Sequence, residues 1–241
     1  MLGNFLIMRN HKTKKERWEE SSQFEREWWT KWKRRTDFQL ARRQLIEKAN
    51  RIKAIIDPYF PSDHRKILQI GPGANAEINL LPGDRFAIDP LASYFKENFR
   101  DFIDPKVDFI EGMAEKLPYP DSYFDVILIL NVLDHCWNPL KVIDEMARCL
   151  RPNGILVLQL NIYKYAASYL HFFFRFLDKE HPHALTHRFL KYHFSPHFDL
   201  LEESLSPLGL PIQSKLKMMA SILIKVLQLF PVLYQGVFRK K

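Results

Sequence analysis

The apolar residues of this chain follow two different periods, which meet near Asp57. Before that point they recur every three or four residues, the spacing of an amphipathic helix with one apolar stripe. The stripe consists of Phe38, Ala41, Leu45, Ala49, Ile52 and Ile56. After it, where Pro58 and Pro61 interrupt the helical period, short apolar runs alternate with segments long enough to form helices. The runs are KILQI, RFAID, VDFI, FDVILIL and GILVLQL.

Near-continuous apolar runs are typical of strands that are buried on both faces of a parallel sheet. Their alternation with helical stretches such as residues 138–150 predicts a doubly wound α/β fold with helices on both sides. Because the period changes near Asp57, we expect a helical extension over residues 1–56 and the sheet domain over residues 57–241. Ligands of such sheets bind at the carboxyl ends of the strands, so the residues after each run are candidates for chemistry.

The chain has 241 residues, 46% of them hydrophobic and 27% charged, which excludes collagen-like, disordered and disulfide-scaffold classes. All of the net charge of +8 lies in residues 1–56, which hold 15 basic and 7 acidic side chains, while the rest hold 21 of each. Two cysteines and an opening apolar run too short for a secretory segment favour a cytoplasmic setting. Lys225 and Pro231 interrupt the apolar stretch 218–234, so we expect no membrane span.

Gly71, Pro72 and Gly73 follow the run KILQI and precede a short helical stretch. Glycines at such a turn let the backbone approach a ligand closely. Asp89 ends the second run, where a carboxylate can accept hydrogen bonds from both hydroxyl groups of a ribose. Together they predict an adenosine cofactor and leave NAD and S-adenosylmethionine open. A tight turn without a ligand, and a helix cap at Asp89, are the structural alternatives.

Residues 107–158 distinguish between the two cofactors. With the glycine loop and Asp89, they resemble the class I S-adenosylmethionine-dependent methyltransferases of the ubiquinone/menaquinone-methylase-like group. The segments that carry the resemblance are Gly112-Met113-Ala114-Glu115, Leu117-Pro118, Phe124-Asp125-Val126, 132–135 and Arg151-Pro152-Asn153-Gly154. No tyrosine is followed by lysine four positions later, as a tyrosine-lysine dehydrogenase would require, which argues against NAD.

The resemblance implies a Rossmann-like, seven-stranded methyltransferase sheet, mostly parallel with an antiparallel last strand, and S-adenosylmethionine as the cofactor. It implies that the loop from Gly71 to Gly73 lies against the methionine part of that cofactor. Asp89, followed by Pro90, is implied to hold the ribose.

The same resemblance implies that Met113 and Ala114 edge the adenine and that Asn131 lines the floor beneath the methionine part. Two positions depart from the family pattern, which often has acidic residues where this chain has Gln69 and Met113. A non-catalytic Rossmann-like nucleoside-binding module is therefore the alternative to an enzyme.

A hydroxyl or acidic carbon acceptor needs a base, a role that histidine suits near neutral pH. Five of the nine histidines lie between His181 and His197, where the resemblance places the acceptor site. His181, His183 and His187 are the candidate catalytic bases, with a structural role as the alternative for each. We expect no metal, because no cysteine joins this cluster. His135 is nearer the cofactor floor, where stabilising a turn is the favoured interpretation.

Aromatic and basic residues alternate in the extension, and Phe24, Trp28 and Trp32 share one helical face. We expect this face to pack across the domain and close the cofactor cleft. Peripheral contact with an anionic membrane and RNA binding are the alternatives. Phenylalanines at 172–174 and 176 favour a small-molecule or lipid-linked acceptor, methylated on oxygen or carbon. An RNA methyltransferase that uses the basic arm is disfavoured because the body is charge-neutral.

Overall fold

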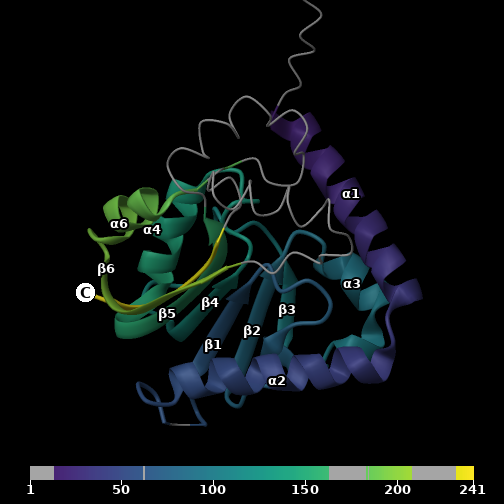
Figure 1. Ribbon diagram of the computed structural model, residues 1–241, viewed down its shortest axis with the longest axis horizontal. Helices are drawn as coiled ribbons and strands as arrows, with labels where there is room; N and C mark the ends of the chain where they lie inside the picture. Colours follow the sequence, from purple (N-terminus) through teal and green to yellow (C-terminus); the bar gives the residue numbers. More distant parts are fainter. Residues whose placement is uncertain (1–13, 62, 163–182, 184, 208–231) are drawn as a thin grey trace, which may run out of the picture.

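A single seven-stranded sheet organises the computed structural model (Figure 1). The structure describes residues 14–61, 63–162, 183, 185–207 and 232–241, with the backbone alone for 14–22. The strands are β1 (Lys66–Ile70), β2 (Asp84–Asp89), β3 (Asp108–Glu111), β4 (Phe124–Leu130), β5 (Leu150–Ile162), β6 (Phe198–Pro207) and β7 (Val232–Lys240). Their order is β3-β2-β1-β4-β5-β7-β6, with β7 antiparallel to both neighbours and the other pairs parallel. The expected fold, a mostly parallel sheet with an antiparallel last strand, is confirmed.

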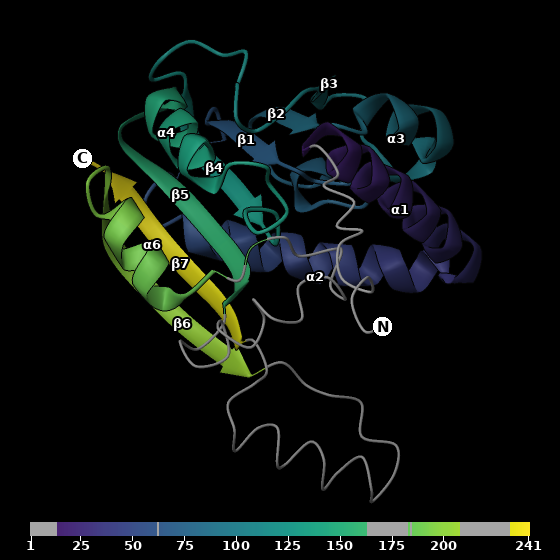
Figure 2. The same cartoon turned by 90° about the horizontal axis from the view of Figure 1, so that it is seen from above.

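Helices cover both faces of this sheet (Figure 2). They are α1 (Lys14–Arg35), α2 (Phe38–Ile56), α3 (Ala92–Asn98), α4 (Pro139–Cys149) and α6 (His187–Phe194), with short 3₁₀ turns η1 (Glu77–Asn79) and η2 (Arg100–Phe102). Successive strand residues point to opposite faces: Leu68 packs in the apolar cluster with α4 and α6, and Ile67 in the cluster with α2 and α3. This double burial explains why the strands read as uninterrupted apolar runs.

The apolar stripe predicted along residues 38–56 is the buried face of α2. The helix begins after Asp37, whose carboxylate accepts a hydrogen bond from the Leu40 N–H at 2.8 Å. Ile52 and Ile56 pack in the same cluster as Ile67 of β1, so α2 contributes directly to the core of the sheet. The division at Asp57 into extension and domain stays a prediction.

Helix α1 runs beside α3, as both views show (Figures 1 and 2). The Thr30 hydroxyl lies 2.7 Å from the Tyr94 hydroxyl, and Lys33 donates to the carbonyl of Asn98. Trp29 packs edge-on against Phe95, with ring centres 5.4 Å apart. The inner face of α1 is therefore fastened to α3 by polar and aromatic contacts.

The sequence predicts that Phe24, Trp28 and Trp32 pack across the domain and close the cleft. This prediction is wrong for Phe24 and Trp28. Phe24 is 45% exposed and Trp28 is 48% exposed, whereas Trp29 and Trp32 are half-buried. Trp29 and Trp32 are three residues apart, so they also share one face of the helix. Their face is the one that packs on the aromatic side chains of α3 and η2. The sequence alone does not say which of the two stripes has a partner.

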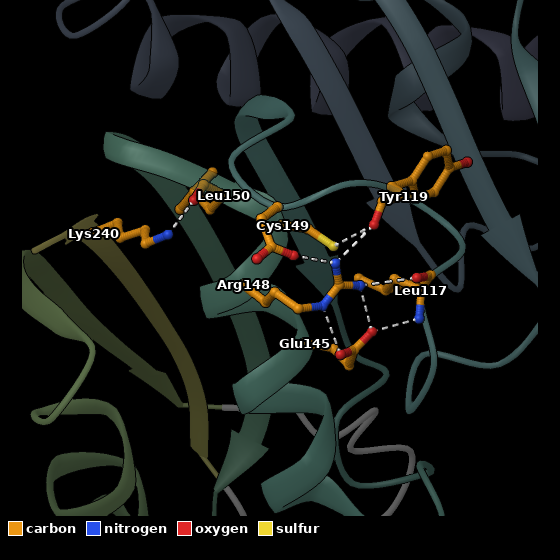
Figure 3. A network of polar contacts seen from close by, with 8 residues as sticks. Leu117, Tyr119, Glu145, Arg148, Cys149, Leu150 and Lys240 are labelled. Carbon is orange, nitrogen blue, oxygen red and sulfur yellow. Dashed lines mark hydrogen bonds and ion pairs between the residues drawn. The ribbon is translucent and has the colours of Figure 1, made fainter.

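Arg148, near the end of α4, holds the segment that follows β3 (Figure 3). Its guanidinium donates to the carbonyl groups of Leu117 and Tyr119 at 3.0 and 2.8 Å, and to the carboxylates of Glu145 and Asp121. These ion pairs raise the pKa of Arg148. The network fixes the chain just after the residues expected to edge an adenine.

Candidate functional site

The loop after β1 has the backbone conformation that its glycines allow. Gly71 and Gly73 have φ angles of 61° and 62°, in the left-handed region that residues with a Cβ rarely adopt. A Cβ on Gly71 would lie 2.7 Å from the Val132 side chain, so this loop packs tightly on the loop that follows β4. The ends of two neighbouring strands, β1 and β4, are thereby held together.

Asp89, at the end of β2, is buried with 3% of its surface exposed and binds two backbone groups. Its Oδ2 accepts from the N–H of Gly73 at 3.1 Å, and its Oδ1 accepts from the N–H of Leu91 at 2.8 Å. Burial raises its pKa to about 6; these two bonds oppose that shift, and the nearby charge of Glu111 adds to it. Because each carboxylate oxygen can accept more than one hydrogen bond, Asp89 retains the capacity to bind hydroxyl groups.

Pro90 follows Asp89 and is partly exposed, as expected for a residue at the rim. On the neighbouring strand, the N–H of Gly112 donates to the carbonyl of Asp89 at 3.2 Å. This bond brings the segment with the half-exposed Met113 and the buried Ala114 beside the end of β2. The glycine loop, Asp89 and this segment therefore meet at one edge of the sheet.

Gln69, where relatives often have an acidic residue, has a structural role. It is 2% exposed; its Oε1 accepts from the N–H of Ile78 at 2.9 Å, and its Nε2 donates to Glu77 at 3.0 Å. These bonds tie η1 to β1. Within the loop itself, the Oδ1 of Asn75 is buried and has no hydrogen-bond partner among the described residues. A buried acceptor without a partner beside a glycine loop fits a ligand that donates hydrogen bonds.

Asn131, the residue expected at the floor, directly follows β4 with a φ of 60°. Its N–H donates to the carbonyl of Gln159 at 2.6 Å, and its Oδ1 accepts from the Nδ2 of Asn161 at 3.2 Å. Asn161, near the end of β5, was not singled out from the sequence, although it directly follows the run GILVLQL. The two asparagines place polar groups side by side at the ends of β4 and β5.

Helix α1 closes one side of the glycine loop. A Cβ on Gly73 would lie 2.3 Å from a ring carbon of Trp29, so the indole lies directly on the loop. One turn earlier, Glu25 hydrogen-bonds to Trp29. Glu25 is exposed, yet desolvation of its carboxyl group and the neighbouring charge of Asp89 raise its pKa to about 7, against the effect of the Trp29 bond.

The structure places one of the three candidate histidines, His187, and it lies away from this edge. His181 lies outside the described residues, and His183 is half-buried. The Nε2 of His187 lies 3.0 Å from the Glu203 carboxylate on β6, the strand at the far edge of the sheet from the glycine loop. Nothing in this geometry brings His187 to the loop after β1, and the roles of the three stay predictions.

His135, in the loop after β4, lies nearer to the glycine loop. Its backbone N–H donates to the carbonyl of Val132 at 2.9 Å, a bond that does not depend on the imidazole, so the turn-stabilising role of the side chain stays a prediction. The neighbouring Asp134 is fully buried, and within the described part of the chain neither of its carboxylate oxygens has a hydrogen-bond partner. The Nε2 of His135 lies 3.9 Å from its Oδ1. A buried carboxylate in this state is costly and points to a role beyond folding.

The described residues form neither a metal cluster nor a membrane-spanning helix. In those ranges, no group of three histidine, cysteine or carboxylate side chains is arranged to hold a metal ion. None of the helices there has the length and apolar character needed to cross a membrane.

Comparison with known proteins shows which family the residues at this edge resemble. The family described as a methyltransferase domain matches residues 68–158, which include the glycine loop, Asp89, Met113 and Asn131. Over residues 68–158 this chain is similar to S-adenosylmethionine-dependent methyltransferases. The methyltransferase domain thus contains every cofactor-binding residue expected from the sequence, and its family and cofactor are the ones expected.

Two curated relatives illustrate what this methyltransferase domain is similar to. The ubiquinone/menaquinone biosynthesis C-methyltransferase UbiE of Vibrio parahaemolyticus is 31% identical over 108 residues, 40% of this chain and 42% of that protein. The 27-O-demethylrifamycin SV methyltransferase of Amycolatopsis mediterranei is 45% identical over 56 residues, 23% of this chain and 21% of that protein. The chain spans less than half the length of these curated relatives.

The fold has many solved counterparts. The YcgJ protein of Bacillus subtilis aligns with a TM-score of 0.59 at 16% identity, covering 78% of this chain and 96% of the other. This likeness supports the sheet architecture alone.

Proposed function

We propose that this protein is an enzyme that transfers a methyl group from S-adenosylmethionine to a small-molecule or lipid-linked acceptor. The observation that carries the proposal is the convergence of Gly71, Gly73, Asp89 and the 112–114 segment at one edge of a methyltransferase-type sheet. The cofactor, when bound, supplies an activated methyl group with its leaving group attached. The work left to the protein is mainly to bind, orient and exclude water.

The residues that would hold the cofactor follow from the site. Asp89 accepts hydrogen bonds from hydroxyl groups without losing its two backbone bonds. Asn75 offers a buried acceptor in the glycine loop. Met113 and Ala114 provide apolar surface beside Asp89, and Asn131 together with Asn161 provides polar groups at the floor.

For the base that takes a proton from the acceptor, we propose His135. It lies in the loop that also contains Val132, which packs on Gly71. The buried side chain of Asp134 lies 3.9 Å from the Nε2 of this ring and limits how the ring can turn. Asp134 would thus act as a positioning residue, and His181 and His183 remain candidates in the acceptor region.

The assignment of His135 is tested by replacing it with glutamine and by making the same change at His197, which pairs with Asp144 at the opposite edge of the sheet. Removing a general base lowers kcat by about 10²- to 10⁴-fold. We expect a loss of that size in kcat for H135Q, with affinity for S-adenosylmethionine unchanged and H197Q like the wild type. Equal activity of H135Q and wild type would reassign the base to the acceptor region.

The acceptor itself is identified by transfer of a labelled methyl group to fractions of a cell extract. We expect label in a small or lipid-extractable product, on oxygen or carbon; the names of the two curated relatives include one C-methyltransferase and one O-demethyl substrate. Label recovered in RNA would favour the alternative that uses the basic arm. Cofactor binding without transfer to any fraction would favour a non-catalytic binding module.

One structural observation favours a membrane surface as a further partner. The outer face of α1 exposes Phe24 and Trp28 beside Lys31 and Arg35. Aromatic and basic side chains on one face of a helix suit an anionic lipid surface. In a salt series, binding to anionic vesicles by the full chain should shift tryptophan emission to the blue, and replacing Phe24 and Trp28 by serine should abolish the shift. Binding to tRNA alone, falling steeply with salt, would contradict this proposal.

A further inference from the structure

Helix α1 carries an acidic side chain to the cofactor edge, although it lies outside the matched family segment 68–158. Glu25 precedes Trp29 by one turn and hydrogen-bonds to it, and the Glu25 side chain is exposed. Trp29 is pressed onto Gly73, whose N–H donates to Asp89 at 3.1 Å. A continuous chain of contacts therefore runs from Glu25 through Trp29 and Gly73 to the buried carboxylate of Asp89.

The position of this chain of contacts is fixed by the residues that follow Glu25 in α1. The carbonyl of Arg26 accepts from the Tyr94 hydroxyl at 3.1 Å, and Thr30 lies 2.7 Å from the same hydroxyl. Trp29 packs against Phe95 and Phe99 with ring centres 5.4 and 5.8 Å away. Tyr94, Phe95 and Phe99 all belong to the α3 region, which begins directly after Asp89, so Glu25 and Asp89 are held by the same packed unit.

We propose that α1 completes the cofactor site, with the Glu25 carboxylate acting beside Asp89 as a second acceptor for the hydroxyl groups of the ribose. Each carboxylate oxygen of Asp89 already accepts one hydrogen bond, from the N–H of Gly73 or of Leu91. A vicinal diol has two donors, and a second carboxylate lets each hydroxyl group find an ionised acceptor. The inference rests on the proposed function, because it assumes the nucleoside cofactor that Asp89 is proposed to bind.

The charged groups around Glu25 and Asp89 determine how cofactor binding depends on pH. Asp89 on β2 and Glu111 on β3 are the neighbouring carboxylates, and Arg26 lies over the Tyr94 ring at 5.8 Å. With pKa values raised to about 7 for Glu25 and about 6 for Asp89, part of the pair is protonated near neutral pH. Hydroxyl donors favour the ionised forms, so ligand binding releases protons and affinity increases as pH rises from about 6 to about 8.

The test uses calorimetric titration of the full chain with S-adenosylmethionine and with S-adenosylhomocysteine, at pH values from about 6 to about 8 and in buffers of different ionisation enthalpy. The variants are E25A, E25Q and D89A. E27A is the matched control on the outer face of the same helix, where Glu27 pairs with Lys31 at 3.8 Å. Thermal melts of each variant verify that the fold is intact.

We expect E25A to weaken binding of both ligands by about three- to tenfold, the range of one lost hydrogen bond. E25Q should recover part of the affinity, because its amide oxygen still accepts, but it should release fewer protons than the wild type. E27A should match the wild type in both respects.

Each contrary result has a separate meaning. If E25A binds with the wild-type affinity and pH dependence while D89A is weakened, the role of Glu25 is overturned and the proposed function stands. If E25Q changes affinity but keeps wild-type proton release, the carboxylate pair is likewise overturned. If the wild type binds neither ligand at any pH, the proposed function fails and this inference fails with it.

Discussion

Asp89 combines a proposed ligand-binding role with a structural one, and the two roles favour opposite charge states of its carboxyl group. The structure shows bonds from Asp89 to Gly73 and Leu91 that fasten the glycine loop and the start of α3. The sequence suggested either a ribose acceptor or a helix cap; the N-cap of α3 is Leu91, whose N–H donates to Asp89, so Asp89 fastens the turn before the helix and does not cap it. Burial favours the neutral carboxyl group, whereas hydroxyl donors favour the carboxylate.

The first prediction concerns the pH dependence of stability at Asp89. Its pKa is raised from 3.8 to about 6, so its contribution to stability is complete below about pH 4 and is lost as pH rises through about 6. The loss at neutral pH is on the order of 2 to 3 kcal/mol. We expect D89N, which cannot ionise, to show a flatter dependence of melting temperature on pH and to bind S-adenosylmethionine more weakly. An unchanged pH dependence in D89N would show that Asp89 is not the titrating group.

The second prediction concerns Gly73. Alanine there must adopt a φ of 62°, which costs about 1 to 2 kcal/mol, and its Cβ must also displace Trp29. We expect G73A to loosen α1, with tryptophan emission shifted to the red and weaker cofactor binding. In the double variant G73A/W29A the steric part of the penalty should disappear, which a double-mutant cycle measures. Strict additivity of the two changes would contradict the contact.

Residue-scale features were the hardest to predict from the sequence. The glycine loop and Asp89 were found because they follow apolar strands directly. Glu25 could not be found that way, because it reaches the site through the packing of a distant helix. Asn161 directly follows the run GILVLQL, so the same rule could have found it. Their roles depend on which helix face is covered and which strand ends are neighbours.

At the scale of elements, the central strands and α4 were predicted closely. The run FDVILIL is β4, and the helical stretch 138–150 is α4 with one residue fewer at each end. These elements are buried on a face or on both, so their apolar pattern is unambiguous. By contrast, β6 lies at the edge of the sheet with Leu200 and Leu205 exposed, and its sequence has no continuous apolar run.

The third prediction distinguishes the two aromatic stripes of α1. Trp32 packs against Trp29 and Phe102 with ring centres 5.3 and 5.4 Å away, whereas Trp28 is 48% exposed. We expect W32A to lower the free energy of unfolding by about 2 kcal/mol and W28A to change it by less than about 0.5 kcal/mol. Urea titrations of both variants measure the difference. The reverse order would mean that the other stripe faces the domain.

The fourth prediction concerns the clamp on the segment after β3. Lysine in place of Arg148 keeps the charge but cannot reach Glu145, Asp121 and two backbone carbonyl groups together. We expect R148K to be destabilised by about 2 kcal/mol. The control is R51K, at an exposed position on α2, which should have little effect. If the two variants were equally stable, the network would have no structural role.

For the whole molecule, the sequence predicted a charge-neutral body and a basic extension, and the structure shows how the extension is used. Its inner face packs on α3 and on the glycine loop, and its outer face exposes aromatic and basic side chains. The same helix can therefore close the cofactor site and present a surface to a partner. The apolar stripe of α2, in turn, is part of the sheet's own core.

The central claim, that the edge formed by the glycine loop and Asp89 binds S-adenosylmethionine, is tested most directly by calorimetric titration of the full chain with S-adenosylmethionine and, separately, with NAD. We predict saturable binding of one S-adenosylmethionine per chain, weakened in D89N, and no binding of NAD. Binding of NAD with no affinity for S-adenosylmethionine would contradict it.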